Sequence, residues 1–143
     1  MRTGPRSRGH RSLPHTADVI VQSWGPDVAA CCEEAVAGLA ALYVDAPGAV
    51  IVETRTRHLS PDDADAMLVE LLEEVIFILD TAAAVPVRAR IRDSADGGVD
   101  VALDLATWSS VEPTGAVPKA ISQSGLEFQV DRSGARCSFL VDV

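Results

Sequence analysis

The stretch SPDDADAMLVELLEEVIFIL, residues 60–79, carries the most decisive pattern in the sequence. It opens on Ser60-Pro61-Asp62-Asp63, where a serine can cap a helix, a proline suits the first helical position and an acid follows three residues after the serine. Apolar residues then recur at helical spacing: Met67, Leu68, Leu71, Leu72, Val75, Ile76 and Leu79. This pattern predicts a helix that starts directly after Ser60 and is the most buried element of the fold.

Upstream of residue 60, the sequence predicts two strands and another helix. Residues 18–24 and 50–58 are rich in apolar and β-branched residues, which is typical of strands. Between them, Gly25-Pro26-Asp27 can open a helix, because proline is favoured in a first turn. The helix has one apolar stripe, which contains Cys32 and leaves Cys31 to one side: Val28, Cys32, Ala35, Val36, Leu39, Leu42 and Tyr43.

Downstream of residue 79, the pattern changes to strands. Residues 85–91 and 99–105 alternate apolar with charged residues on either side of Asp96-Gly97-Gly98, which predicts a hairpin with arginines of one strand facing aspartates of the other. Residues 126–130 and 135–143 predict two further strands. The order strand, helix, strand, helix and then several strands predicts an α+β fold: a two-layer domain in which two helices cover one face of a mostly antiparallel sheet.

The charge is unevenly distributed along the 143 residues. Residues 1–13 contain four arginines and no acid, and residues 14–143 then hold 8 basic and 21 acidic groups, a net charge of −13. We interpret 1–13 as a disordered basic tail and 14–143 as one domain. A body this acidic repels a phosphate backbone, so tight direct binding to nucleic acid is not expected.

The three cysteines and the hydropathy indicate a cytoplasmic protein. Cys31, Cys32 and Cys137 form neither an even disulfide framework nor a zinc-binding spacing. No apolar run reaches the ~18 residues that a membrane-spanning helix needs, and no apolar stretch follows the arginines as in a secretory signal. We therefore expect no association with a membrane.

Signatures of catalysis are scarce. The sequence lacks a G-x-x-x-x-G-K-[ST] phosphate loop, a G-x-S-x-G nucleophile turn and an H-E-x-x-H zinc motif. It has three histidines, and Lys119 is its only lysine. General bases and amine nucleophiles are therefore few.

Two aspartates at the ends of apolar strands are the candidate chemical groups. Asp18 begins the first predicted strand and Asp142 ends the last one. A carboxylate among apolar strand residues is costly to bury unless it is paired or binds a cation. If the two strands meet, Asp18, Asp142 and the terminal carboxylate of Val143 could bind a hard cation such as Ca²⁺ or Mg²⁺. The alternative is that both carboxylates face water.

The motifs resemble those of the archease family. His15-Thr16-Ala17-Asp18-Val19 is similar to the family's H-T-A-D-[VI] opening, Pro118-Lys119-Ala120-Ile121-Ser122 to its K-A-[VI]-[TS] block, and Asp142-Val143 to its D-[IV] ending. The resemblance covers roughly residues 14–143. Gln123-Ser124 stands where the family commonly has Tyr-His, so the chain resembles a divergent, bacterial-type member.

This resemblance implies a function. Archeases are accessory proteins of the tRNA-splicing RNA ligase, which joins 2′,3′-cyclic-phosphate or 3′-phosphate ends to 5′-hydroxyl ends, and they promote its guanylylation and multiple turnover. Carried over, Asp18, Asp142, Val143 and Asp45 are metal ligands, with calcium the most typical metal and magnesium the other hard cation. Lys119 matches the functional lysine, and His15 is assigned to partner contact or activation.

Other interpretations stay open at the level of sequence. The same acids could serve a small metal-dependent enzyme that acts on a phosphorylated substrate, with Lys119 contacting phosphate. The chain could also be an interaction domain that has lost its metal. His15 could simply fix its loop by hydrogen bonding, and Lys119 could be a solvated side chain. The favoured expectation is an activator that is not itself an enzyme.

Overall fold

The computed structural model describes residues 7–15, 18–115 and 117–143. These residues form two α-helices, one 3₁₀-helix and nine strands. In chain order the elements are β1 Gly9–His15, β2 Asp18–Gly25, α1 Val28–Ala40, β3 Val44–Asp45, β4 Ile51–Leu59, α2 Ala64–Thr81, β5 Val85–Asp93, β6 Val99–Ala106, η1 Trp108–Ser110, β7 Glu112–Pro113, β8 Ala120–Asp131 and β9 Gly134–Asp142.

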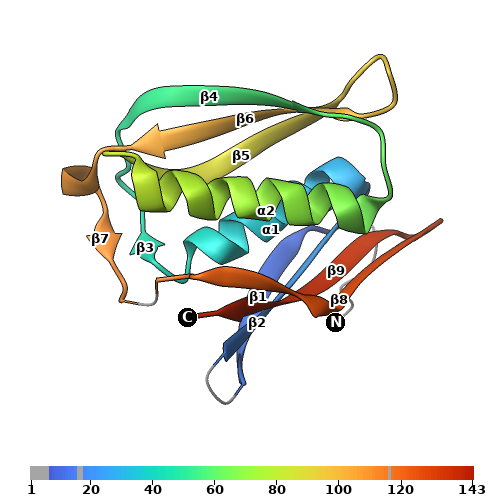
Figure 1. The fold of residues 1–143 in the computed structure, drawn as a ribbon, viewed down its shortest axis with the longest axis horizontal. Helices are drawn as coiled ribbons and strands as arrows, with labels where there is room; N and C mark the ends of the chain where they lie inside the picture. The colour runs from blue at the N-terminus through green and yellow to red at the C-terminus, as the bar shows by residue number, and fades with distance from the viewer. Residues whose placement is uncertain (1–6, 16–17, 116) are drawn as a thin grey trace.

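The strands are divided among three antiparallel sheets. The largest has the order β1-β2-β9-β8, a second has the order β4-β6-β5, and β3 pairs with β7 alone. Figure 1 shows α1 and α2 lying between the two larger sheets, with the β3–β7 pair at one end. The hydrophobic core fills the space between these layers, so each larger sheet is covered on one face and open on the other.

The predicted α+β class is confirmed, with two helices and antiparallel strands. The single predicted sheet, however, is two separate sheets with the helices between them. Strand periodicity shows which residues share a face, but it does not show which strands are hydrogen-bonded neighbours. The predicted hairpin is confirmed: β5 pairs with β6 in antiparallel register, with Arg88 opposite Asp104 and Arg92 opposite Asp100.

Helix α1 begins at Val28, directly after the predicted Gly25-Pro26-Asp27 opening, although Pro26 precedes the N-cap and is not in the first turn. Asp27 is its N-cap, and its Oδ1 accepts a hydrogen bond of 2.8 Å from the backbone N–H of Ala30. Cys31, which was predicted to lie beside the apolar stripe, is fully buried. The reason is that α1 packs on two layers, against β2 on one side and β5 on the other. A helix covered on two sides buries more than one stripe.

The predicted start of α2 is wrong by three residues. The helix begins at Ala64 after Asp63, and Ser60 is not its cap. Residues 60–63 instead pass over the β5–β6 turn, where a Cβ at Gly98 would lie 2.1 Å from the carbonyl oxygen of Leu59. The chain therefore leaves β4 along a path that the tertiary contact sets, not the local capping pattern.

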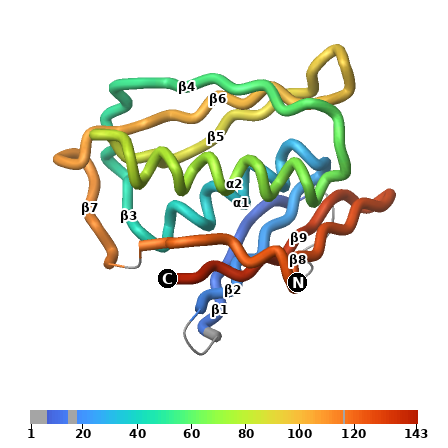
Figure 2. Tube along the Cα trace, in the orientation of Figure 1, coloured from blue at the N-terminus to red at the C-terminus, as the bar shows by residue number. Residues whose placement is uncertain are grey.

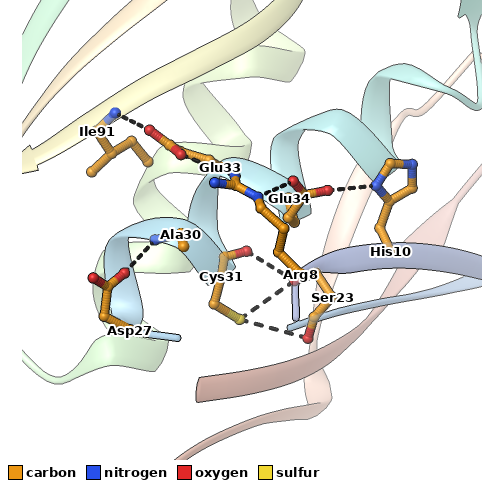
Figure 3. A network of polar contacts seen from close by, with 9 residues as sticks. All are labelled: Arg8, His10, Ser23, Asp27, Ala30, Cys31, Glu33, Glu34 and Ile91. Atoms are coloured by element: carbon orange, nitrogen blue, oxygen red, sulfur yellow. Dashed lines mark hydrogen bonds and ion pairs between the residues drawn. The ribbon is translucent and has the colours of Figure 1, made fainter. Parts of the chain in front are cut away.

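The predicted disordered tail also needs correction, because residues 9–13 belong to strand β1. Every residue of β1 pairs with β2. Glu34 of α1 anchors this strand: its carboxylate accepts a 2.6 Å hydrogen bond from Arg8 Nε and lies 2.9 Å from His10 Nδ1. Figure 3 shows these contacts. Residues 1–6 lie outside the described part of the chain, so the prediction of a tail there remains a prediction.

Glu33, the neighbour of Glu34, links three elements in the same network. Its carboxylate accepts a 3.0 Å hydrogen bond from Arg8 and a 2.7 Å hydrogen bond from the backbone N–H of Ile91 (Figure 3). Ile91 lies on β5, which is an edge strand of its sheet. One carboxylate on α1 therefore holds both the start of β1 and the edge of β5.

The open face of the β4-β6-β5 sheet contains a buried carboxylate, Asp104, whose side chain is 2% exposed. It accepts hydrogen bonds from Thr54 Oγ1 at 2.8 Å, Arg88 Nε at 2.6 Å and Arg90 Nη2 at 2.8 Å. The hydrogen bonds from Arg90 and then Arg88 hold the pKa of this carboxyl well below its usual range, although burial opposes them. The ionised carboxylate joins all three strands of the sheet.

We predict that Asp104→Asn lowers the free energy of unfolding by about 1–3 kcal/mol at neutral pH, because it removes a charge that three donors satisfy. Urea denaturation measures the change. Because the pKa of Asp104 is depressed by folding, its contribution is present above the unfolded pKa of about 3.9 and is lost as pH falls below it. The gap between the two proteins should therefore narrow in acid.

The control for this prediction is Asp100→Asn on the same strand, where the carboxylate is 52% exposed. It should change stability by less than about 0.5 kcal/mol. An equal loss in both variants would show that Asp104 has no special role.

Candidate metal centre

The first and last predicted strands meet, as the metal-site hypothesis required. β2 and β9 are antiparallel neighbours at the centre of the four-stranded sheet, and Figure 2 shows them side by side. Asp18 is directly opposite Asp142 in their register. Residues opposite each other in an antiparallel pair have Cβ atoms about 4.5–5.5 Å apart and point to the same face. The fold therefore sets two carboxylates from opposite ends of the chain side by side.

Both aspartates lie on the open face of this sheet. Along β2, Val21 and Ser23 are buried against the helices, so the alternate positions Asp18, Ile20 and Gln22 face outward. Asp142 is exposed and Asp18 is half-buried. Two like charges directly opposite each other are unfavourable in a sheet. The two carboxylates therefore repel each other, and a cation bound between them would offset this repulsion.

Lys119 and Val143 lie next to the pair. The backbone N–H of Lys119 donates a 2.7 Å hydrogen bond to the carbonyl oxygen of Asp142, and Ala120 is opposite Asp142 in the β8–β9 register. The side chain of Lys119 is exposed. Val143 follows Asp142 directly and packs partly against the core. Two residues that the motif selected are thus fixed to the acidic pair by backbone contacts.

Asp45 is not joined to this pair by any contact in the described part of the chain. It lies on β3, opposite Glu112 of β7, in the separate two-stranded sheet. Both Asp45 and Glu112 are exposed. Asp45 as a metal ligand stays a prediction. Asp45 and Glu112 therefore form a second pair of directly opposed carboxylates. The sequence did not predict this pairing, because two-residue strands leave almost no periodic signal.

His15 pairs through its backbone with Asp18, since these residues are opposite each other in the β1–β2 register. Its side chain and residues 16–17 lie outside the described part of the structure, so the assigned role stays a prediction. Gln123 and Ser124 are exposed residues in the irregular part of β8 between Ser122 and Glu127.

The acidic pair supplies a partial set of ligands. Within residues 7–15, 18–115 and 117–143, no group of three or more His, Cys, Asp or Glu side chains is arranged around one metal position. The two carboxylates nevertheless match the preference of calcium for charged oxygen ligands, with water completing its 6–8 positions. The residues present fit a hard cation and not a thiolate-bound soft metal, because the cysteines lie on the other face of the sheet.

On the buried face of the four-stranded sheet, a serine hydroxyl contacts two cysteines. Ser23 Oγ donates a 3.0 Å hydrogen bond to the carbonyl oxygen of Cys31 and lies 2.9 Å from Cys137 Sγ. All three cysteines are free and buried. Burial raises the pKa of Cys32 to about 12, so this thiol stays protonated. These groups pack α1 onto β2 and β9 and so support the strands that carry the two aspartates.

The fold and site define a small α+β protein with paired carboxylates where its first core strand meets its last. Residues 10–143 match the Archease protein family. Two curated relatives, from Mycobacterium tuberculosis strains CDC 1551 and H37Rv, each bear the name "Probable protein archease". Each is 45% identical over 137 residues, which cover 96% of this chain and 76% of the relative. The chain belongs to the Archease family.

A solved structure has the same fold. The solution structure of Methanobacterium thermoautotrophicum Protein 1598 aligns with a TM-score of 0.74 and covers 94% of this chain and 99% of its own. The sequence identity is 20%, so this likeness concerns the fold alone. Neither α1 nor α2 is long and apolar enough to cross a bilayer, among the residues that the structure describes.

We predict that Asp18→Asn stabilises the protein by about 0.2–1 kcal/mol in the presence of a chelator, because it removes repulsion between directly opposed carboxylates. Thermal unfolding in chelator at low salt measures the change. Asp80→Asn, which removes an exposed charge from α2, is the control for the general effect of lowering the net charge. If Asp18→Asn is instead less stable than the wild type in chelator, the two carboxylates do not repel each other enough to destabilise the metal-free protein.

Proposed function

We propose that this protein binds a divalent cation, calcium in preference to magnesium, and activates a tRNA-splicing RNA ligase without being an enzyme itself. The supporting observation is that Asp18 and Asp142 are directly opposed, with Lys119 hydrogen-bonded beside them, in a member of the Archease family. The activity proposed for the ligase complex is promotion of guanylylation and multiple turnover in tRNA splicing or RNA repair.

The proposed metal ligands are the carboxylates of Asp18 and Asp142 and the terminal carboxylate of Val143. A bound cation supplies positive charge that offsets the repulsion between the two strands. Because Ca²⁺ takes 6–8 oxygen ligands, part of its coordination stays available to water or to an oxygen of a partner. Asp45 is a further candidate ligand. The residues of this chain thus hold an exposed charge on a rigid sheet, close to the C-terminal end of β9.

Lys119 is the residue proposed to act on the partner. Its backbone is fixed to β9 while its side chain is exposed, so the ammonium group can reach a phosphate or a carboxylate outside the protein. An activator changes the ligase only by contacting one of its conformations better than the other. Lys119, with His15 as a second contact, would supply that difference by favouring the ligase conformation that accepts the guanylyl group.

The alternative of a small metal-dependent enzyme has less support from the site. A hydrolytic or transfer reaction needs a general base near the metal. His10 faces α1, where it contacts Glu34, and His58 lies on β4 between Asp96 and Asp100. Neither of these two histidines shares the face that carries Asp18 and Asp142, which leaves His15, opposite Asp18 in the β1–β2 register, as the remaining histidine that could act as such a base. An activator requires only contact with its partner, which this site can provide.

The buried thiols, none of which forms a disulfide, agree with the proposed cytoplasmic location.

We predict that calcium raises the melting temperature of the wild-type protein in a saturable way, since a ligand that binds the folded state stabilises it by about 2.7 kcal/mol at a hundred times its Kd. Asp18→Asn and Asp142→Asn should remove most of this rise. Differential scanning calorimetry in calcium, magnesium and chelator measures it. If the melting temperature is the same in all three conditions, the protein does not bind these metals, and the alternative of an interaction domain that has lost its metal is favoured.

The terminal carboxylate gives this experiment a matched control. A short extension after Val143 moves the terminal charge away from the site and adds bulk, while the same extension before Met1 does neither. The C-terminal extension should bind calcium more weakly. Equal affinities would remove Val143 from the set of ligands.

We predict that Lys119→Ala reduces stimulation of guanylylation of the cognate ligase at saturating concentrations, while folding changes by less than about 0.5 kcal/mol. A single-turnover assay with labelled GTP measures the rate with and without the protein. Arg132→Ala removes an equally exposed positive charge in the turn between β8 and β9, and it should stimulate as well as wild type. Full stimulation by Lys119→Ala would exclude this lysine from the mechanism.

A further inference from the structure

The side chains on the open face of the four-stranded sheet change in character from row to row, starting from the row of Asp18 and Asp142. Strand registers place outward-facing residues in successive rows across β1, β2, β9 and β8. After the row of Asp18 and Asp142 come an apolar row, a polar row and a row around a tryptophan. Their members are Leu13, Ile20, Leu140 and Ser122; Arg11, Gln22, Ser138 and Glu127; and Gly9, Trp24, Arg136 and Gln129.

The apolar row is not part of the core. Leu13 is 41% exposed, and Ile20 and Leu140 are half-buried residues outside the core cluster. Among the residues that the structure describes, no helix covers this face, because α1 and α2 pack on the opposite one. A contiguous set of exposed apolar side chains framed by charged rows is typical of a protein-binding surface.

The two rows beyond it form a hollow of about 270 Å³ with two arginines in its lining. Arg11 is held in place: its guanidinium lies 5.6 Å from the centre of the Trp24 ring, and its Nε donates a 2.6 Å hydrogen bond to Gln22. Trp24 in turn lies against Gly9, where an added Cβ would come within 2.7 Å of the ring. A guanidinium fixed by stacking and by a neutral amide is preorganised to bind an anion.

The charges of these arginines are not neutralised within the protein. Among the described residues, no carboxylate forms an ion pair with Arg11, and Arg136 has only a 3.8 Å contact with Asp131, at which the arginine side chain is 60% exposed. The opposite holds on the other sheet, where Asp104 binds two arginines closely. In a protein with a net charge of −9, an unneutralised pair of arginines in a hollow is suited to an external carboxylate.

We propose that this face is the docking surface for a protein segment that has an acidic side chain next to an apolar one. The carboxylate lies between Arg11 and Arg136, and the apolar side chain lies on Leu13, Ile20 and Leu140. Adjacent rows are about 7 Å apart, because a strand rises about 3.4 Å per residue. Arg11 lies one row and Arg136 two rows from the apolar row, so the partner segment places its two anchors about 7–14 Å apart. The inference rests on the proposed function, with the cognate RNA ligase as the partner.

Nucleic acid fits this surface less well than such a segment does. A polynucleotide carries evenly spaced negative charge, and the rows at either side of Leu13 include Asp18, Asp142 and Glu127. Of these acids, only Glu127 lines the hollow itself, together with Arg11 and Arg136. A single carboxylate beside an apolar group therefore meets two positive charges and one negative charge there, and stays clear of Asp18 and Asp142. Docking here also brings the partner close to the acidic pair and to Lys119, because the apolar row is adjacent to the row of Asp18 and Asp142 on the same face of the sheet.

The test compares the affinity of the purified cognate ligase for three variants by isothermal titration calorimetry. Arg136→Glu should weaken binding at least tenfold, which corresponds to about 1.4 kcal/mol, because it removes a charge pair and introduces repulsion. Leu13→Ser should weaken binding severalfold. Arg92→Glu makes the same charge reversal on an exposed position of β5, on the other sheet, and should bind as wild type does. Thermal melts confirm that each variant is folded.

The outcomes separate this inference from the proposed function. At saturating concentration Arg136→Glu should still stimulate guanylylation, whereas Lys119→Ala should not. Wild-type affinity in Arg136→Glu and Leu13→Ser would overturn the docking surface and leave activation standing. Binding that depends on Arg136 without any stimulation by the wild type would support the surface and refute activation. Loss of RNA binding in Arg136→Glu, with ligase binding unchanged, would assign the surface to nucleic acid and overturn the proposal.

Discussion

The pairing of β2 with β9 is the constraint on which the rest of this structure depends. The two strands come from opposite ends of the described chain and form the centre of the four-stranded sheet. Their register sets every outward pair, including Asp18 with Asp142, and every inward pair, including Ser23 with Cys137. A slip of one residue would exchange the two faces of a strand, placing a charged residue in the core. Burial of Val21, Phe139 and Val141 therefore fixes the position of the acidic pair.

Helix α1 transmits this constraint to the second sheet. It packs closely on β2, since a Cβ at Gly25 would lie 2.8 Å from the Cβ of Ala30, and a Cβ at Gly38 would lie 2.8 Å from Val21. The same helix lies against β5 on its other side. Since the contact with β2 leaves no room for a side chain at either glycine, α1 holds that sheet at a close and fixed distance. The open face that carries the site is thereby supported by a rigid layer.

Local patterns predicted what local physics controls. The opening of α1 at Gly25-Pro26-Asp27, the apolar spacing of α2 and the Asp96-Gly97-Gly98 hairpin were all visible in the sequence because neighbouring residues determine them. The approach of Asp18 to Asp142 was a hypothesis that required the first and last strands to meet, and the resemblance to the archease family, more than residue type, favoured it. What could not be predicted depends on distant contacts: the division into two sheets, the strand formed by residues 9–13, and the late start of α2 over the β5–β6 turn. The two-residue strand of Asp45 gave too short a pattern to place that residue.

The contact between Glu33 and the backbone of Ile91 has a consequence for how copies of this protein meet. An edge strand presents unpaired backbone donors, and a second chain can extend the sheet by pairing with them. Here a carboxylate from α1 already occupies one of these donors on β5 and is itself bound to Arg8. A strand that approached from another molecule would have to displace both contacts and bring its carbonyl groups against a negative charge. The salt bridge between Glu33 and Arg8, which secures the start of β1, thus also disfavours self-association at this edge of the sheet.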